Sequence, residues 1–275
     1  MVRLGHIEYS NCLPVHALLL EQGAPPGIEL VPGVPAVLNA ELAAGRIDVA
    51  PCSSIEYARH ADRYRLFPGL SISSRGPVGS ILLETDRPVE ALDGAVVALP
   101  TASATSVVLL RILLERRWGL AVRYRWFDQA REPDPVGAGA AAALWIGDVA
   151  LRRALVTSRR LIDLGEAWWE WTGLPFAFAV WQISAGPEKD RELERLYGLL
   201  VESRAYFEAN AEALAARHAA RHGLEPGHLL RYWRSLDYSL GEELQQGLLH
   251  YYRLAAELEA VPGVPELRWF TPPRT

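Results

Sequence analysis

The sequence predicts an α/β protein with a helical last third. Through the first two thirds, short apolar runs typical of strands alternate with helical stretches, as in VRLGHIEY (2–9) followed by VHALLLE (15–21). This alternation indicates parallel α/β units with right-handed crossovers. From Glu188 to about Val261 the sequence is charged, amphipathic and almost entirely helical, with a Pro-Gly break at 226–227. That pattern is typical of helices that pack onto an α/β core.

Each expected element has a local signal. Strands are expected in the aliphatic and β-branched runs at 2–9, 27–33, 47–54, 78–85, 94–100, 122–127 and 142–148. Pro14 suits the first turn of the first helix. Leu38 and Leu42 give the second helix one apolar face, and a longer apolar helix follows at 106–118. The low-complexity patch at 134–143 is expected to be a loop that runs into the next strand.

Composition limits the class of protein. The chain has 275 residues, enough for two modest lobes, with 50% hydrophobic and 22% charged residues. A net charge of −5 without a long basic run argues against a nucleic-acid partner. No apolar run reaches the roughly 18–20 residues of a membrane span, and the N-terminus lacks the pattern of a signal peptide. Cys12 and Cys52 form no CxxC pair, so we expect buried thiols and a cytoplasmic location.

Small polar residues follow most of the predicted strands. In open α/β sheets, ligands bind beyond the carboxyl ends of the strands. The residues at these positions are Ser10, Asn11, Ser53, Ser54, Ser73, Ser74, Ser80, Thr101, Ser103, Thr105, Ser106 and Asp148. Hydroxyls, an amide and one acid therefore dominate the predicted ligand edge, and no Lys, His or Cys does.

Two predicted helix starts carry more hydroxyls than a single cap requires. They are Ser53-Ser54 and the stretch Ser103–Ser106. The free N–H groups of a helix N-terminus bind anions, and added hydroxyls can hold a carboxylate. We therefore expect an anionic small molecule between these two ends. Ordinary N-capping and turn chemistry are the alternative explanation.

Other motifs indicate less. His218 and His222 have the i, i+4 spacing of a zinc helix but lack the Glu of HExxH, so no metal site is expected there. The aromatic segment 168–181 is typical of core packing. Glu170 within it is a possible pocket acid that no motif singles out.

Six segments in order carry a family resemblance. RLGHIEYSNCLPV, ELAAGRIDVAPCSSIEYAR, SISSRGPVGSILLET, LPTASATS, LWIGDVAL and TGLPFAFAVW, between residues 3 and 181, resemble the motif series of the MqnA family, the chorismate dehydratases of the futalosine route to menaquinone. The resemblance implies a two-lobe fold like that of type II periplasmic binding proteins, with mixed or parallel sheets and a cleft between the lobes. We place lobe 1 at 1–78 plus 180–275 and lobe 2 at 79–179.

The resemblance also implies an activity and a site. The reaction would remove water from chorismate to give 3-[(1-carboxyvinyl)oxy]benzoate, without a metal or organic cofactor. The implied catalytic residues are Asn11, Ser80 and Asp148, and the implied substrate-binding residues are Ser53, Ser54, Thr101, Ser103, Thr105, Ser106 and Gly147. Ser10 stands where the family usually has an apolar residue. The sister enzyme that makes dihydroxynaphthoate has a motif resembling SPCPNDTF, whereas this chain has YSNCLPVH.

Several alternatives stay open at this point. The proton acceptor could be Asp148, whose other expected role is to cap the helix that follows, or the enolpyruvyl carboxylate of the substrate itself. The same fold would serve the sister reaction, or a protein that only binds a small carboxylate. A regulatory effector domain is disfavoured because a strand is predicted from residue 2, with no preceding helix-turn-helix. The sequence does not decide between a monomer and a homodimer.

Overall fold

A computed structural model describes residues 1–272. The strands form two five-stranded sheets. The first sheet contains β1 (Val2–Ile7), β2 (Ile28–Gly33), β3 (Val49–Ser53), β4 (Arg65–Ser74) and β10 (Phe176–Ile183), in the order β2-β1-β3-β10-β4. The second contains β5 (Ile81–Thr85), β6 (Val96–Pro100), β7 (Arg123–Phe127), β8 (Ala142–Ile146) and β9 (Arg160–Asp163), in the order β7-β6-β8-β5-β9.

Both sheets are mixed rather than wholly parallel. In the first sheet, β1 runs parallel to β2 and β3, whereas β10 runs antiparallel to β3 and β4. In the second, β6 runs parallel to β7 and β8, whereas β5 runs antiparallel to β8 and β9. The antiparallel strands are those next to the two crossings of the chain between the sheets.

The chain crosses between the sheets twice. It leaves the first sheet after β4 and returns to it at β10. The boundary predicted at 78/79 falls in the first connection. The boundary predicted at 179/180 falls inside β10, which pairs with the first sheet from Phe176 onward. The division of the chain into lobes at those residues stays a prediction.

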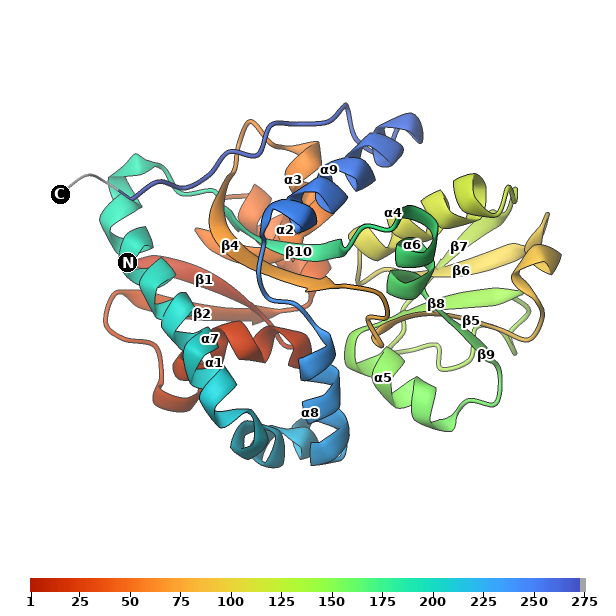
Figure 1. Ribbon diagram of the computed structural model, residues 1–275, viewed down its shortest axis with the longest axis horizontal. Coiled ribbons are helices and arrows are strands. Elements are labelled where there is room, and N and C mark those ends of the chain that lie inside the picture. Colours follow the sequence, from red (N-terminus) through yellow and green to blue (C-terminus); the bar gives the residue numbers. More distant parts are fainter. Residues whose placement is uncertain (273–275) are drawn as a thin grey trace.

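Helices cover both sheets, as Figure 1 shows. The helices that follow strands of the first sheet are α1 (Leu13–Gln22), α2 (Pro35–Ala43) and α3 (Ser54–Arg59). Those that follow strands of the second are α4 (Thr105–Ile112), continued by a π-helical turn at Leu113–Arg117, α5 (Gly147–Val156) and α6 (Leu164–Thr172). Short 3₁₀ turns lie at Ser10–Cys12, Val89–Leu92, Pro187–Lys189 and Ala219–His222.

The helical tail is confirmed, but its interruptions differ from the prediction. It consists of α7 (Asp190–His218), α8 (Pro226–Ser235) and α9 (Glu242–Glu257). Pro226 begins α8 rather than breaking it, and the chain turns instead at Gly223, whose φ is +67°. The segment 236–241, expected to be helical, is not. Asp237 exchanges two backbone hydrogen bonds with Ser73 at the edge of β4, which takes the place of helical bonding there.

The core confirms the expectations for the thiols and part of the aromatic segment. Cys12, Cys52, Trp168 and Trp181 are all fully buried. Glu170 is no pocket acid, because its side chain is 56% exposed and pairs with Arg117 on the surface. None of the helices within residues 1–272 combines the length and the apolar character needed to cross a bilayer.

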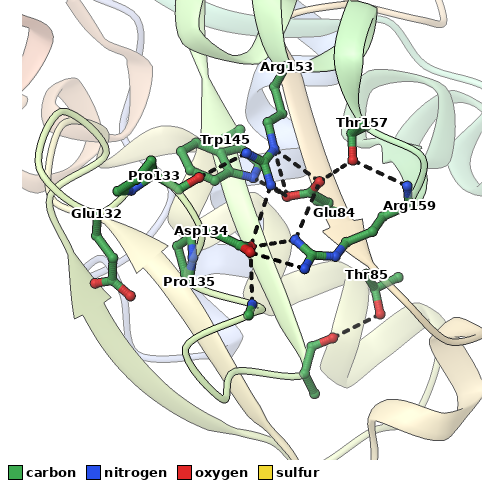
Figure 2. A network of polar contacts seen from close by, with 12 residues as sticks. Glu84, Thr85, Glu132, Pro133, Asp134, Pro135, Trp145, Arg153, Thr157 and Arg159 are labelled. Atoms are coloured by element: carbon green, nitrogen blue, oxygen red, sulfur yellow. Dashed lines mark hydrogen bonds and ion pairs between the residues drawn. The ribbon is translucent and has the colours of Figure 1, made fainter.

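A buried carboxylate ties α5 to the second sheet, as Figure 2 shows. Glu84 on β5 has no exposed surface. It accepts hydrogen bonds from Trp145 Nε1 on β8, at 2.9 Å, and from Arg153 Nε on α5, at 3.0 Å. Arg153 and Arg159 also contact Asp134, which lies in the loop between β7 and β8. This network sets the position of α5, whose first residues face the other sheet.

We predict that Glu84→Gln destabilises the fold by about 1.5–3 kcal/mol, because it removes the buried charge that Arg153 and Arg159 face and leaves them only Asp134 as a partner. Glu170→Gln is the control: it breaks an exposed pair and should cost under about 0.5 kcal/mol. Urea unfolding midpoints of the two variants measure the difference. Equal midpoints would show that the buried network does not hold α5.

Candidate functional site

A cavity of about 470 Å³, counting its mouth toward solvent, lies where the two sheets face each other. Its walls come from strand ends, helix starts and the connections between them. The lining residues are Ile7, Tyr9, Asn11, Pro35, Ser53, Ile72, Ser80, Ile81, Ser103, Thr105, Ser106, Ile146, Gly147, Phe178 and Ala179.

Most of the predicted site residues meet in this cavity. Seven line it: Asn11, Ser53, Ser80, Ser103, Thr105, Ser106 and Gly147. Ser54, Thr101 and Asp148 do not line it. Thr101 is exposed and borders a neighbouring groove, whereas Ser54 and Asp148 are buried beside the cavity.

Thr105 shows why the start of α4 carries extra hydroxyls. Its Oγ1 accepts a hydrogen bond from the backbone N–H of Ile55, at 3.2 Å, and lies 3.4 Å from Ser54 Oγ. Two tyrosines of α9 support the pair: Tyr251 donates to the Thr105 carbonyl and Tyr252 to the Ser54 carbonyl. Thr105 therefore joins the N-terminus of α3 to that of α4, as well as lining the cavity.

Ser103 and Ser106 form a donor that faces the cavity. Ser103 Oγ accepts from the Ser106 backbone N–H, at 3.3 Å, and donates to Ser106 Oγ, at 3.0 Å. The hydroxyl of Ser103 thus caps the first turn of α4, as ordinary capping would predict. Because Ser106 Oγ receives that bond, its own hydrogen is free to bind a ligand. The N–H groups of this helix start add further donors.

Asp148 is fully engaged outside the cavity. Its carboxylate accepts from the Ser10 backbone N–H, at 3.1 Å, and from Ser10 Oγ, at 2.5 Å. Its second oxygen lies 2.8 Å from His222 Nδ1. The alternative that Asp148 caps α5 is wrong: it lies within the first turn and makes no capping bond. Its contacts instead connect α5 to the N-terminal turn and to the helical tail.

The remaining polar groups of the cavity are neutral. Asn11 Oδ1 is buried without a hydrogen-bond partner. Burial, and then the nearby Asp148 charge, raise the pKa of Tyr9 to about 12, so Tyr9 stays protonated at neutral pH. None of the described residues that line the cavity carries a carboxylate, an imidazole or an ammonium group.

One wall residue, Gly147, belongs to the LWIGDVAL motif, whereas one neighbour of the cavity, Tyr232, belongs to no motif. Gly147 has φ +62°, and a Cβ there would lie 2.7 Å from the Tyr9 ring, so glycine is required by both conformation and space. Tyr232 of α8 donates to Ser80 Oγ, at 2.8 Å. Tyr232 lies in the amphipathic tail, where the sequence does not distinguish a tyrosine beside the site from one that only packs in the core.

One buried group within residues 1–272 has the composition of a metal site: His6, Cys12 and His16. The hydrogen bonds argue against a metal there. Trp181 Nε1 donates to His16 Nε2, at 3.2 Å, so in a neutral ring His16 Nδ1 carries the proton. That proton points to His6 Nδ1, 3.0 Å away, and leaves His16 Nδ1 no lone pair for a metal. His218 and His222 contact two different carboxylates, Glu21 and Asp148, rather than a common site.

Comparison with known proteins identifies the family. A family model described as menaquinone biosynthesis matches residues 2–257. The chain belongs to this family. The resemblance stated for the motifs between residues 3 and 181 is therefore confirmed, and the match extends through most of the helical tail.

Two relatives of the chain are named as chorismate dehydratases. The protein from Thermus thermophilus is 31% identical, over 95% of this chain and 96% of its own length. The protein from Campylobacter jejuni is 34% identical, over 64% of each chain. In fold, the chain is similar to the periplasmic aliphatic sulphonate binding protein SsuA from Escherichia coli. That structure has a TM-score of 0.72 and 16% identity, covering 100% of this chain and 93% of that one. The predicted periplasmic-binding-protein-like fold is confirmed.

The histidine cluster predicts a pH dependence of stability. Burial, and then the charges of Arg221 and His222, lower the pKa of His6 from its usual 6.5 to about 4. The unfolded chain therefore binds a proton at this residue between pH 6.5 and 4 that the folded protein does not, so the folded state is destabilised as the pH falls. We expect His6 to account for about 2 kcal/mol of lost stability between pH 7 and pH 5.

His6→Asn tests this, because asparagine keeps an acceptor near His16 but does not titrate. Urea unfolding at pH 7 and pH 5 should show a smaller loss of stability in the variant than in the wild type. Identical losses would mean that His6 titrates normally in the folded protein.

Proposed function

We propose that this protein removes water from chorismate to give 3-[(1-carboxyvinyl)oxy]benzoate. The observation that carries the proposal is the meeting of Asn11 and Ser80 with the hydroxyl-rich start of α4 in one cavity. The family and the names of the two relatives support the same reaction. Chorismate has a carboxylate and a single hydroxyl on its ring, and neutral hydrogen-bond donors and acceptors such as these can bind both groups.

The start of α4 suits the ring carboxylate of the substrate. Ser106 offers a free hydroxyl hydrogen, and the helix N-terminus adds N–H donors. When C3 loses its proton, negative charge spreads through the conjugated ring into this carboxylate. Fixed donors there would stabilise the transition state more than the ground state.

The proton acceptor in this proposal is the substrate. The lining residues that the structure describes offer no base, and Asp148 is already bound by Ser10 and His222. The enolpyruvyl carboxylate, attached through oxygen to C3, takes the C3 proton when the site holds it nearby. The electron pair of the C3–H bond forms the C3–C4 double bond, and the C4–O bond breaks. The proton held by the enolpyruvyl carboxylate then passes to the departing hydroxide, which leaves as water, and the carboxylate is restored.

Asn11 and Ser80 would act on the departing hydroxyl. Asn11 Oδ1 has an unused lone pair, which can accept the hydrogen of the C4 hydroxyl. Ser80 receives a hydrogen bond from Tyr232, so its own hydrogen can be donated to the leaving oxygen. This hydrogen bond and the aromatisation of the ring then assist departure of the hydroxyl.

The proposal is tested by incubating the purified protein with chorismate in the presence of EDTA and without nucleotide. A product lighter by one water, with the absorption of a benzoate, is expected in mass and ultraviolet spectra. Unchanged chorismate beside folded protein would overturn the proposal. Binding without turnover would then indicate a carrier of small carboxylates.

Substitution of Asp148 distinguishes the two candidate proton acceptors, Asp148 and the enolpyruvyl carboxylate of the substrate. We predict that Asp148→Asn keeps kcat/KM within about tenfold of wild type, since the amide can keep contacts to Ser10 and His222. Ser80→Ala should lose about a hundredfold, a usual value for a positioned proton donor. A loss of about a thousandfold or more in folded Asp148→Asn would identify Asp148 as the base.

The carboxylate-binding role of α4 is tested at Ser106. Ser106→Ala should lower kcat/KM by about ten- to a hundredfold, the value of a hydrogen bond to a charged group. Ser106→Thr keeps the hydroxyl and is the matched control. Steady-state kinetics that are unchanged in Ser106→Ala would place the ring carboxylate elsewhere.

A further inference from the structure

Tyr232 reaches the site from a part of the chain that carries none of the motifs. It lies on α8 in the helical tail, is 5% exposed, and donates its phenol hydrogen to Ser80 Oγ at 2.8 Å. Ser80 directly precedes β5 and lines the cavity. The contact therefore joins the tail to the connection between the two sheets.

The backbone around Ser80 is fixed without any help from Tyr232. The Asp163 carboxylate accepts hydrogen bonds from the N–H groups of Val78 and Gly79, at 3.0 and 2.6 Å. The Ser80 carbonyl accepts from the Gly147 N–H, at 2.8 Å. What these bonds leave undetermined is the rotation of the Ser80 hydroxyl.

The Tyr232 phenol removes that freedom. Burial, foremost, raises the pKa of Tyr232 well above its usual value, so the phenol stays protonated and remains a donor. The neighbouring side chains of Ser80 and Asn11 oppose that effect. A serine oxygen that accepts from a buried donor directs its own hydrogen elsewhere. The open direction at Ser80 is the cavity.

We propose that Tyr232 is a positioning residue that holds the Ser80 hydroxyl with its hydrogen directed at the substrate. Tyr232 does not line the cavity and acts through Ser80. This inference rests on the proposed function, because it assigns Ser80 as the donor to the departing hydroxyl. It also gives the helical tail a part in the chemistry.

A double-mutant cycle on chorismate dehydration tests the inference. Tyr232→Phe should lower kcat about tenfold and change KM less than about threefold, since it lets the Ser80 hydroxyl rotate without moving the backbone. In the Ser80→Ala background the same change should have no further effect on kcat. Tyr57→Phe is the control: it removes another buried phenol, bonded to the Glu266 carbonyl away from the cavity, and should leave kcat unchanged.

Three outcomes contradict the inference. The first is an unchanged kcat in Tyr232→Phe. The second is a tenfold loss that recurs in the Ser80→Ala background, which would make Tyr232 a general support of the fold. The third is a wild-type protein that does not dehydrate chorismate. That result overturns the proposed function and this inference with it, and it is seen before any variant is compared.

Discussion

The carboxylate of Asp148 is the constraint on which the site depends. It lies on α5, the helix that follows β8 of the second sheet. Its hydrogen bonds go to Ser10 in the N-terminal turn and to His222 in the helical tail. Asp148 adjoins Gly147 and Ser10 adjoins Asn11, so this one carboxylate sets two walls of the cavity relative to each other. Because it is buried, removal of its partners would leave a costly unpaired charge. The acid that the motifs make most conspicuous thus has a clear role in assembling the cavity.

Among residues 1–272, those that line the cavity include no carboxylate, imidazole or ammonium group, and this limits what the protein supplies to the reaction. The proposed substrate brings two carboxylates, and the walls provide hydroxyls, an amide and the N–H groups of α4. Neutral donors fixed in a poorly solvated space interact strongly with anions and do not reorganise during the reaction. In this account the protein contributes position and donors, and the substrate contributes the base.

The sequence predicted the parts of this site that arise from local rules. Hydroxyls at strand ends and helix starts, such as Ser53 and Ser106, could be located because parallel strands bring their carboxyl ends to one edge. Thr101 followed the same rule but is exposed, because a strand-end position does not determine which way a side chain points. Ser54 also occupies a strand-end position, but its side chain points to Thr105 and not into the cavity.

The features that the sequence did not predict depend on contacts between distant segments. Tyr232 meets Ser80 across 152 positions of the chain, and no local pattern distinguishes it from a core aromatic residue. The four-residue strand β9 (Arg160–Asp163) has no apolar run to mark it and forms by pairing with β5. The non-helical segment at 236–241 results from pairing between Asp237 and Ser73, which competes with a sequence that favours helix.

In the proposed mechanism the substrate supplies the base. It is tested most directly with a chorismate analogue whose enolpyruvyl carboxylate is replaced by a carboxamide. The analogue's binding is measured by competition, and its dehydration is followed under saturating conditions. The account predicts that the bound analogue is dehydrated at least about a thousandfold more slowly than chorismate, because proximity of the base is lost. Turnover within about tenfold of the rate for chorismate would contradict the account and require a base on the protein.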